Sequence, residues 1–224
     1  MPIKTLRALI FDFDGLILDT EITLFHAWQE IYHKYGFSLS MQEWAEFLGH
    51  SADPLEPYLA LERHLGRPIE REILHSERVK REAELLQAQE ALPGVQALIL
   101  DAKKQAIRLA VASSSDRDWV IKHLTRLNLI HYFDVLKCAE DVLHTKPHPD
   151  LYYAALEELG INPDEAIALE DSINGVKAAK AAGIFCVAVP NRITKNVHID
   201  QADLVLDSLL GISLEDLQSM VRDG

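Results

Sequence analysis

The sequence predicts an α/β protein: a doubly wound parallel sheet with an inserted block of helices. Short apolar runs alternate with helical stretches from Val95 onward, and one further apolar run, residues 8–11, lies near the N-terminus. Between them, residues from about 20 to 90 show helical patterns only. Because strands that alternate with helices are typical of parallel sheets, we expect a core domain of residues 1–17 and 91–224 and a helical domain of residues 18–90.

The first predicted strand is Ala8–Phe11, an uninterrupted apolar run of the kind found in buried parallel strands. Helices are expected between the later strands, and Gly160 and Gly183 stand where helix C-terminal caps are expected. The later strands are predicted at 107–112, 133–138, 166–169, 184–189 and 204–206.

The inserted block is predicted to contain four helices. Aromatic and aliphatic residues recur at helical spacing before Gly36, which predicts the first helix. Ser40 and Glu43 form a capping-box pattern that opens a second, short helix. The remaining helices are expected from Pro54 to about Gly66 and over 69–91. Pro93-Gly94 ends the second of these helices.

Composition limits the class of protein. The 224 residues suit one domain with an insertion, and the hydrophobic content of 48% is ample for a core. The net charge is −13, and the sequence contains no basic run, so nucleic acid is not expected as a partner. An acidic protein that handles an anionic substrate must neutralise it locally, which favours a bound cation.

Membrane and export segments are also not expected. No apolar run reaches 18 residues, and Asp12 and Asp14 interrupt the apolar stretch near the N-terminus. Cys138 and Cys186 lie in apolar runs, as small core residues do, which favours a reducing, cytoplasmic location. We expect a monomer or a weak homodimer.

Acidic pairs follow two of the predicted strands. Asp12 and Asp14 come directly after the first strand, and Glu170 and Asp171 come directly after the strand at 166–169. Open α/β sheets carry their chemistry at the carboxyl ends of strands, and unpaired buried carboxylates are costly. Two such pairs therefore indicate a functional site, in which Asp12 and Asp171 would form a small oxygen cage for Mg²⁺.

Polar residues that suit a phosphate lie in two further segments. Ser113, Ser114 and Ser115 follow the strand at 107–112, beside the start of a helix, where hydroxyls can hold phosphate oxygens; a capped turn is the alternative. Lys146 lies in a loop stiffened by prolines, with a solvent-facing role as the alternative. One lysine does not neutralise the nearby carboxylates, so a phosphate dianion would be repelled without Mg²⁺.

These segments have a characteristic order along the chain: Asp12-Phe13-Asp14-Gly15, then Ser113, then Lys146-Pro147, then Glu170-Asp171-Ser172. The order resembles the haloacid dehalogenase superfamily over essentially the whole chain, and the resemblance implies a Rossmann-like core. The inserted helices, like the segment 18–21, resemble the small helical cap of the phosphoglycolate phosphatase and β-phosphoglucomutase branch.

The resemblance implies a Mg²⁺-dependent phosphatase that acts on a small phosphorylated metabolite. Asp12 would attack phosphorus to give an aspartyl-phosphate, and Asp14 would protonate the leaving alcohol and then activate water. The implied metal ligands are Asp12, the backbone carbonyl of Asp14 and Asp171, with Glu170 in support. Ser113, Ser114 and Lys146 would hold the phosphoryl oxygens.

Single positions in the sequence argue against the alternatives to a phosphatase. A dehalogenase lacks the second acid of the first motif, so Asp14 argues against that activity. A β-phosphoglucomutase-like phosphotransferase carries a His where this chain has Leu24 and an Arg where it has Ala52, so a hydrolase is favoured. A non-catalytic Mg²⁺- and phosphate-binding protein would be expected to have lost a motif, and none is lost.

The sequence predicts substrate contacts from the helical domain less specifically than it predicts the residues at the strand ends. Glu21 and His50 are the candidate residues for substrate binding in the cap or its hinge, with Ser51, Lys80 and Arg81 as further polar candidates. For each of them, a solvated surface position is the alternative.

Overall fold

The computed structural model describes residues 5–50, 55–193 and 199–223. The chain folds as two units, one of Met1–Asp19 with Glu90–Gly224 and one of Thr20–Gln89. We call them the sheet unit and the helical unit.

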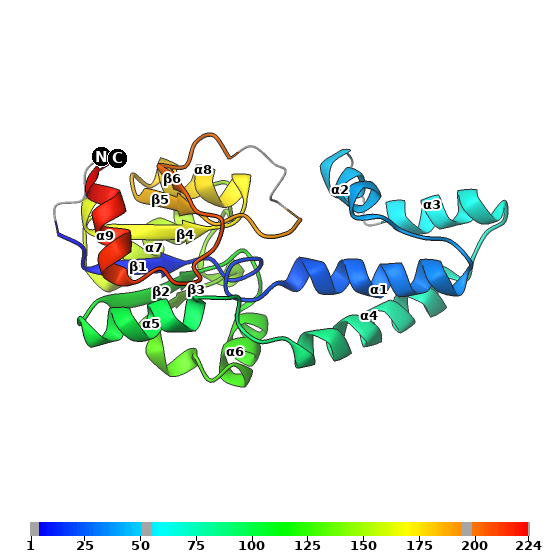
Figure 1. Ribbon diagram of the computed structural model, residues 1–224, viewed down its shortest axis with the longest axis horizontal. Helices are drawn as coiled ribbons and strands as arrows, with labels where there is room; N and C mark the ends of the chain where they lie inside the picture. The colour runs from blue at the N-terminus through cyan, green and yellow to red at the C-terminus, as the bar shows by residue number, and fades with distance from the viewer. Residues whose placement is uncertain (1–4, 51–54, 194–198, 224) are drawn as a thin grey trace. The chain divides into compact units, whose positions relative to one another are not determined.

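The sheet unit is built on six parallel strands in the order β3-β2-β1-β4-β5-β6 (Figure 1). This is the order of a doubly wound Rossmann-like sheet, in which ligands bind at the carboxyl ends of the strands where the winding reverses. The predicted fold class is confirmed. The strands are β1 (Ala8–Phe11), β2 (Arg108–Ala112), β3 (Val135–Lys137), β4 (Ala166–Glu170), β5 (Phe185–Ala188) and β6 (Leu204–Val205).

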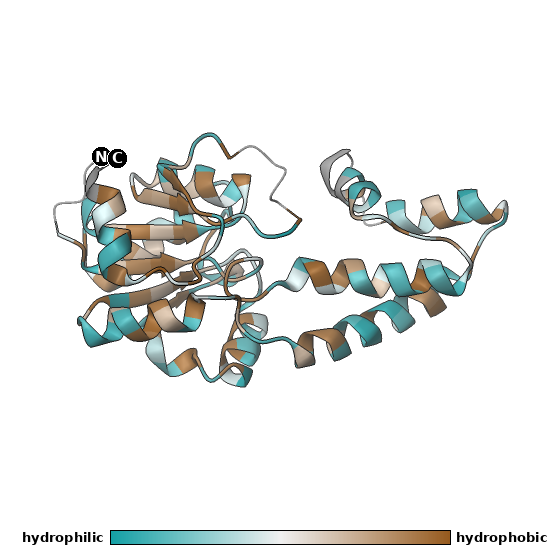
Figure 2. Ribbon diagram, in the orientation of Figure 1, coloured by the Kyte–Doolittle hydropathy of each residue, from teal (hydrophilic) through white to brown (hydrophobic). Residues whose placement is uncertain are grey.

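Helices cover both faces of this sheet. Ala8 and Ile10 of β1 belong to a buried cluster with α7 (Asp150–Leu159) and α8 (Ile173–Ala181) on one face. Because side chains alternate along a strand, Leu9 and Phe11 point to the other face, where α5 packs on β2 and contacts α9. The apolar colouring of the strands in Figure 2 follows from burial on both faces. The other elements are α5 (Val95–Lys104), α6 (Arg117–Arg126), α9 (Leu214–Asp223), η1 (Ile130–Tyr132), η2 (Ala139–Asp141) and η3 (Pro163–Glu165).

The helical unit contains α1 (Thr20–Lys34), α2 (Met41–His50), α3 (Glu56–Leu65) and α4 (Arg71–Ala88). The predicted capping box is present, because the Ser40 backbone N–H donates to Glu43 and the Glu43 N–H donates to the Ser40 hydroxyl. The long helix expected over 69–91 ends at Ala88, since Gln89 is extended. The segment before Pro93 then pairs with the chain that leaves β1, because Leu92 N–H donates to the Ile17 carbonyl at 2.9 Å.

Two further sequence features are settled by the fold. Both cysteines, Cys138 and Cys186, are buried free thiols. Within residues 5–50, 55–193 and 199–223, we find no helix with the length and apolar character needed to cross a membrane.

Candidate active site

The carboxyl ends of the central strands bring three predicted site segments together. β1 lies between β2 and β4, and the sheet pattern continues one residue beyond β1, where Asp12 N–H donates to the Leu169 carbonyl at 2.9 Å. Ser113 N–H likewise donates to the Lys137 carbonyl at 2.9 Å. Glu170 is the last residue of β4. The strand register therefore fixes these residues at one edge of the sheet.

Three carboxylates form the centre of the site. Asp12, Glu170 and Asp171 are all buried, and each offers an oxygen that lies within 4.8 Å of the others. Lys146 makes ion pairs with Asp12 and, at 2.6 Å, with Oε1 of Glu170. The Lys146 Nζ also lies 5.5 Å from the centre of the Tyr152 ring, and the Tyr152 hydroxyl donates to the same Glu170 oxygen at 2.5 Å.

The electrostatics of the cluster are unbalanced. Burial raises the pKa of the Asp12 carboxyl to about 8, although the Lys146 ammonium opposes this shift. Ionised Asp12 and Glu170 in turn raise the pKa of Lys146 above its ordinary value, against the effect of burial. Lys146 therefore stays charged, while burial of the site disfavours the ionised form of Asp12. A second positive charge at this place would lower the pKa of Asp12.

The residues present fit a divalent cation. Among the described residues, Oε2 of Glu170 is fully buried and has no hydrogen-bond partner. The backbone of Gly175 closes around this carboxylate, since an added Cβ at Gly175 would lie 1.8 Å from Oε2. Buried carboxylate oxygens are the ligands that Mg²⁺ prefers, and such a partnerless oxygen is costly without a cation or water.

Asp171 is held in place by two neighbours. The Asn191 side-chain amide donates to Asp171 Oδ2 at 2.8 Å, and Asn191 Oδ1 in turn accepts from the Ile193 backbone N–H at 2.8 Å. Gly15 lies against the same carboxylate in a left-handed conformation with φ of +84°. A Cβ at Gly15 would lie 2.1 Å from Asp171 Oδ2, so no residue with a side chain fits there without moving the carboxylate.

Gly15→Ala is therefore expected to disable the site. The added methyl group displaces Asp171, and the positive φ costs a further ~1–2 kcal/mol of folding free energy. Gly160→Ala is the matched control, because Gly160 also has a positive φ, of +63°, but a Cβ there meets nothing within 4 Å. We expect both variants to lose free energy of unfolding in urea through the positive φ, with the larger loss in Gly15→Ala because of the clash, and only Gly15→Ala to lose activity. Equal activities in the two variants would contradict this placement of Asp171.

Asp14 lies outside the carboxylate cluster and has its own partners. Its Oδ2 accepts from the Ser115 hydroxyl at 2.6 Å, and its Oδ1 accepts from the Trp119 indole N–H at 3.0 Å. The two acids of the first motif thus have separate surroundings.

The other predicted site residues differ in how far they are buried. Ser113 is buried, and its hydroxyl accepts from the Ser115 N–H at 3.0 Å, whereas Ser114 is exposed. Glu21 is half-buried in the first turn of α1. His50 ends α2, and its side chain lies outside the described part of the chain, as do Ser51 and Ala52.

The two cations singled out in the helical unit differ in their surroundings. Arg81 makes ion pairs with Glu30 and Glu84, so its charge is already matched. Lys80 is exposed.

Sequence reasoning missed three residues that contact the site carboxylates: Trp119, Tyr152 and Asn191. Ser115, the third serine of the predicted run, contacts Asp14. Asn191 follows β5 closely, so the rule that led to Asp12 and Glu170 could also have found it. Trp119 and Tyr152 lie on helical faces that read as ordinary core positions, and no local pattern marks them.

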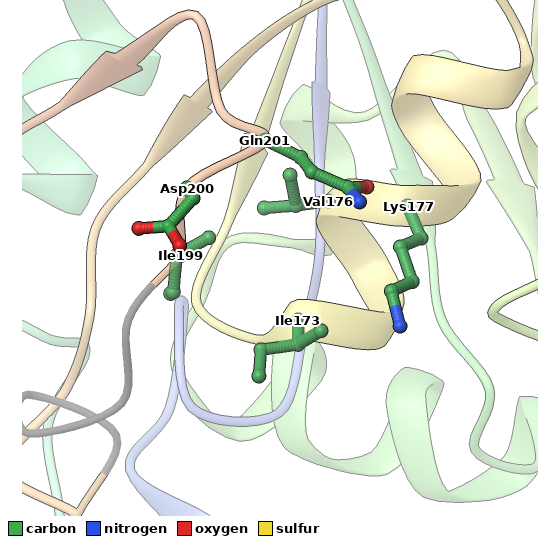
Figure 3. Close-up of a pocket in the computed structure, with 6 residues that line it drawn as sticks. All are labelled: Ile173, Val176, Lys177, Ile199, Asp200 and Gln201. Carbon is green, nitrogen blue, oxygen red and sulfur yellow. The ribbon is translucent and has the colours of Figure 1, made fainter.

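A small hollow lies elsewhere on the sheet unit, between α8 and the chain before β6 (Figure 3). None of the site carboxylates lines it. Its lining residues are Ile173, Val176, Lys177, Ile199, Asp200 and Gln201.

Comparison with known proteins agrees with this geometry. The family model for haloacid dehalogenase-like hydrolases matches residues 9–189, which include Asp12, Ser113, Lys146, Glu170 and Asp171. The chain belongs to this family. The predicted family and the predicted enzyme class, a hydrolase of the phosphatase type, are confirmed by this match and by the relatives that follow.

Three similar proteins cover nearly the same length. Putative phosphatase YhcW of Bacillus subtilis is 40% identical over 209 residues, which is 93% of this chain and 94% of that protein. The Phosphorylated carbohydrates phosphatase of Thermotoga maritima is 33% identical over 80% of this chain and 82% of its own. The crystal structure of CbbY from Rhodobacter sphaeroides in complex with phosphate matches with a TM-score of 0.69 at 32% identity, over 95% of this chain and 99% of that one.

Proposed function

We propose that this protein is a Mg²⁺-dependent phosphatase of a small phosphorylated carbohydrate that works through an aspartyl-phosphate on Asp12. One observation carries the proposal: Asp12, Glu170 and Asp171 are buried together with a partnerless oxygen on Glu170 and with Lys146 against them. Buried carboxylates of like charge destabilise the folded protein, so a purely structural role does not explain such a cluster.

Each residue of the site has a place in the reaction. Asp12 attacks phosphorus, and the bond from phosphorus to the leaving oxygen breaks as Asp14 gives that oxygen a proton. Lys146 and Ser113 hold the oxygens of the transferred group. Asp14, now ionised, takes a proton from the water that attacks the phosphorus of phospho-Asp12, the bond from phosphorus to the Asp12 oxygen breaks, and inorganic phosphate leaves. Bound Mg²⁺, held by Asp12, Asp171 and the Asp14 carbonyl with Glu170 in support, would supply the positive charge that this transfer requires.

The substrate class is inferred from the relatives. The Thermotoga maritima protein is named for phosphorylated carbohydrates, and it matches most of this chain. We infer that the helical unit serves as the cap that selects among such substrates, with Glu21 and His50 as candidate contacts. A panel of hexose, pentose and alditol phosphates and phosphoglycolate, assayed by released phosphate with Mg²⁺, tests this assignment.

The products separate a hydrolase from a phosphotransferase. With β-glucose 1-phosphate and a trace of glucose 1,6-bisphosphate, we expect slow phosphate release and no glucose 6-phosphate, because Leu24 cannot relay a proton as the His of a mutase does. Both products can be followed by ³¹P NMR in one sample. Glucose 6-phosphate formed faster than free phosphate would instead assign a mutase.

A further inference from the structure

We propose that Trp119 is a positioning residue for Asp14: its indole reserves Oδ1 as a hydrogen-bond acceptor, so that the catalytic proton is carried on Oδ2. The inference rests on the proposed function, in which Asp14 is the general acid, and it assigns a task to a residue outside the motifs.

Trp119 is well fixed for this task. It lies in the first turn of α6, and the start of this helix is anchored because the Arg117 backbone N–H donates to both oxygens of Glu140, at 3.1 and 3.2 Å. The indole packs edge-on against His123, with ring centres 4.3 Å apart. His123 is itself buried and lies 6.5 Å from the ring of Phe13, the residue before Asp14.

The two partners of Asp14 differ chemically. An indole N–H can donate a hydrogen bond but cannot accept one, and in a protonated carboxyl the carbonyl oxygen accepts such a bond better than the hydroxyl oxygen does. A serine hydroxyl can both donate and accept. The Trp119 hydrogen bond, at 3.0 Å, therefore favours Oδ1 as the unprotonated oxygen, whereas Oδ2, at 2.6 Å from Ser115 Oγ, can carry the proton or lack it.

This asymmetry defines the path of the proton. In the first step, the O–H bond at Oδ2 breaks as the leaving oxygen of the substrate gains the proton and its bond to phosphorus breaks. In the second step, Oδ2 regains a proton from the water whose oxygen bonds to phosphorus, as the bond from phosphorus to the Asp12 oxygen breaks. The Trp119 indole keeps its own proton throughout.

The kinetic test uses aryl phosphates that differ mainly in the pKa of the leaving phenol. Because kcat/KM reports the step that breaks the bond to the leaving oxygen, loss of a general acid penalises poor leaving groups more than good ones. For Trp119→Phe we expect little loss with the most acidic phenol and ~10-fold loss with the least acidic one. Asp14→Asn should show the same trend more strongly.

Controls separate positioning from general damage. Ser115→Ala removes the other donor, and Ser115→Thr restores a hydroxyl, so the threonine variant should recover the wild-type dependence on leaving group. A Trp119→Phe enzyme that loses the same factor with every phenol has only a structural defect, and that result would overturn the inference.

A second readout does not require activity. In ¹⁵N-labelled protein, the indole N–H signal of Trp119 is the one missing from Trp119→Phe. Asp14→Ala should shift this signal upfield and leave those of Trp28 and Trp44 in place, because only Trp119 among them donates to Asp14 in the described structure. If the signal does not move, the inference about Trp119 is wrong, whereas the proposed function is unaffected. A shifted signal in a protein that hydrolyses no phosphate ester with Mg²⁺ would overturn the proposed function, and the catalytic role of Trp119 with it.

Discussion

Asp12→Asn is expected to lower kcat by ~10⁵-fold or more while the protein stays folded, because a neutral amide cannot attack phosphorus. Asn is nearly the same size as Asp, so packing around β1 is kept. The change also removes one of three buried carboxylates, and burial already raises the pKa of Asp12 to about 8. The free energy of unfolding without metal should therefore be equal to or greater than that of the wild type.

Activity assays and urea unfolding of the two proteins, side by side, test this expectation. Glu157→Gln is a suitable control, since it removes one negative charge from an exposed position on α7. It should leave kcat unchanged. Appreciable turnover by the Asp12→Asn enzyme would mean that another group is the nucleophile.

Removal of divalent cations is expected to have an effect of similar size. With EDTA, the phosphate dianion meets three buried carboxylates opposed by Lys146, so activity should fall to background and return when Mg²⁺ is added. Mg²⁺ should also stabilise the fold, by about 2.7 kcal/mol when its free concentration is about 100 times its Kd, because the unfolded chain does not gather these ligands.

Two variants locate the ion. Asp171→Asn removes a ligand charge and should weaken Mg²⁺ binding strongly, as read from the rise of Tm during a Mg²⁺ titration. Asn191→Ala leaves the ligand but frees its carboxylate, for which we expect a smaller, ~10–100-fold, rise in Kd. Asp200→Asn, at an exposed position, serves as the control. An Asp171→Asn protein with the wild-type Mg²⁺ dependence would place the ion elsewhere.

Much of the sheet and the outline of the site could be predicted from the sequence. An apolar run such as Ala8–Phe11 has one stable place in an α/β fold, the middle of a parallel sheet, and this fixes the edge at which Asp12 emerges. The same reasoning placed Glu170 and Asp171 beside it. Local patterns also predicted the capping box at Ser40, since its contacts lie within one turn.

Contacts between elements distant in sequence could not be predicted in this way. Trp119 reaches Asp14 across 105 positions, and only the packing of α6 on its neighbours brings them together. The end of α4 at Ala88 likewise depends on the pairing of Leu92 with Ile17, a contact between the two connections to the helical unit. Local propensity alone allowed the helix to run to residue 91.

The central claim, covalent catalysis by Asp12, is tested most directly by trapping the intermediate. Asp14→Asn should slow the attack of water more than the attack of Asp12 on an activated aryl phosphate, so phosphoenzyme should accumulate. After acid quench, intact-mass and peptide mass spectrometry should find one phosphoryl group, on Asp12, that disappears in the Asp12→Asn, Asp14→Asn double variant. Turnover of the aryl phosphate by the wild type, with no phosphoryl group on Asp12 in any quenched sample, would contradict the account.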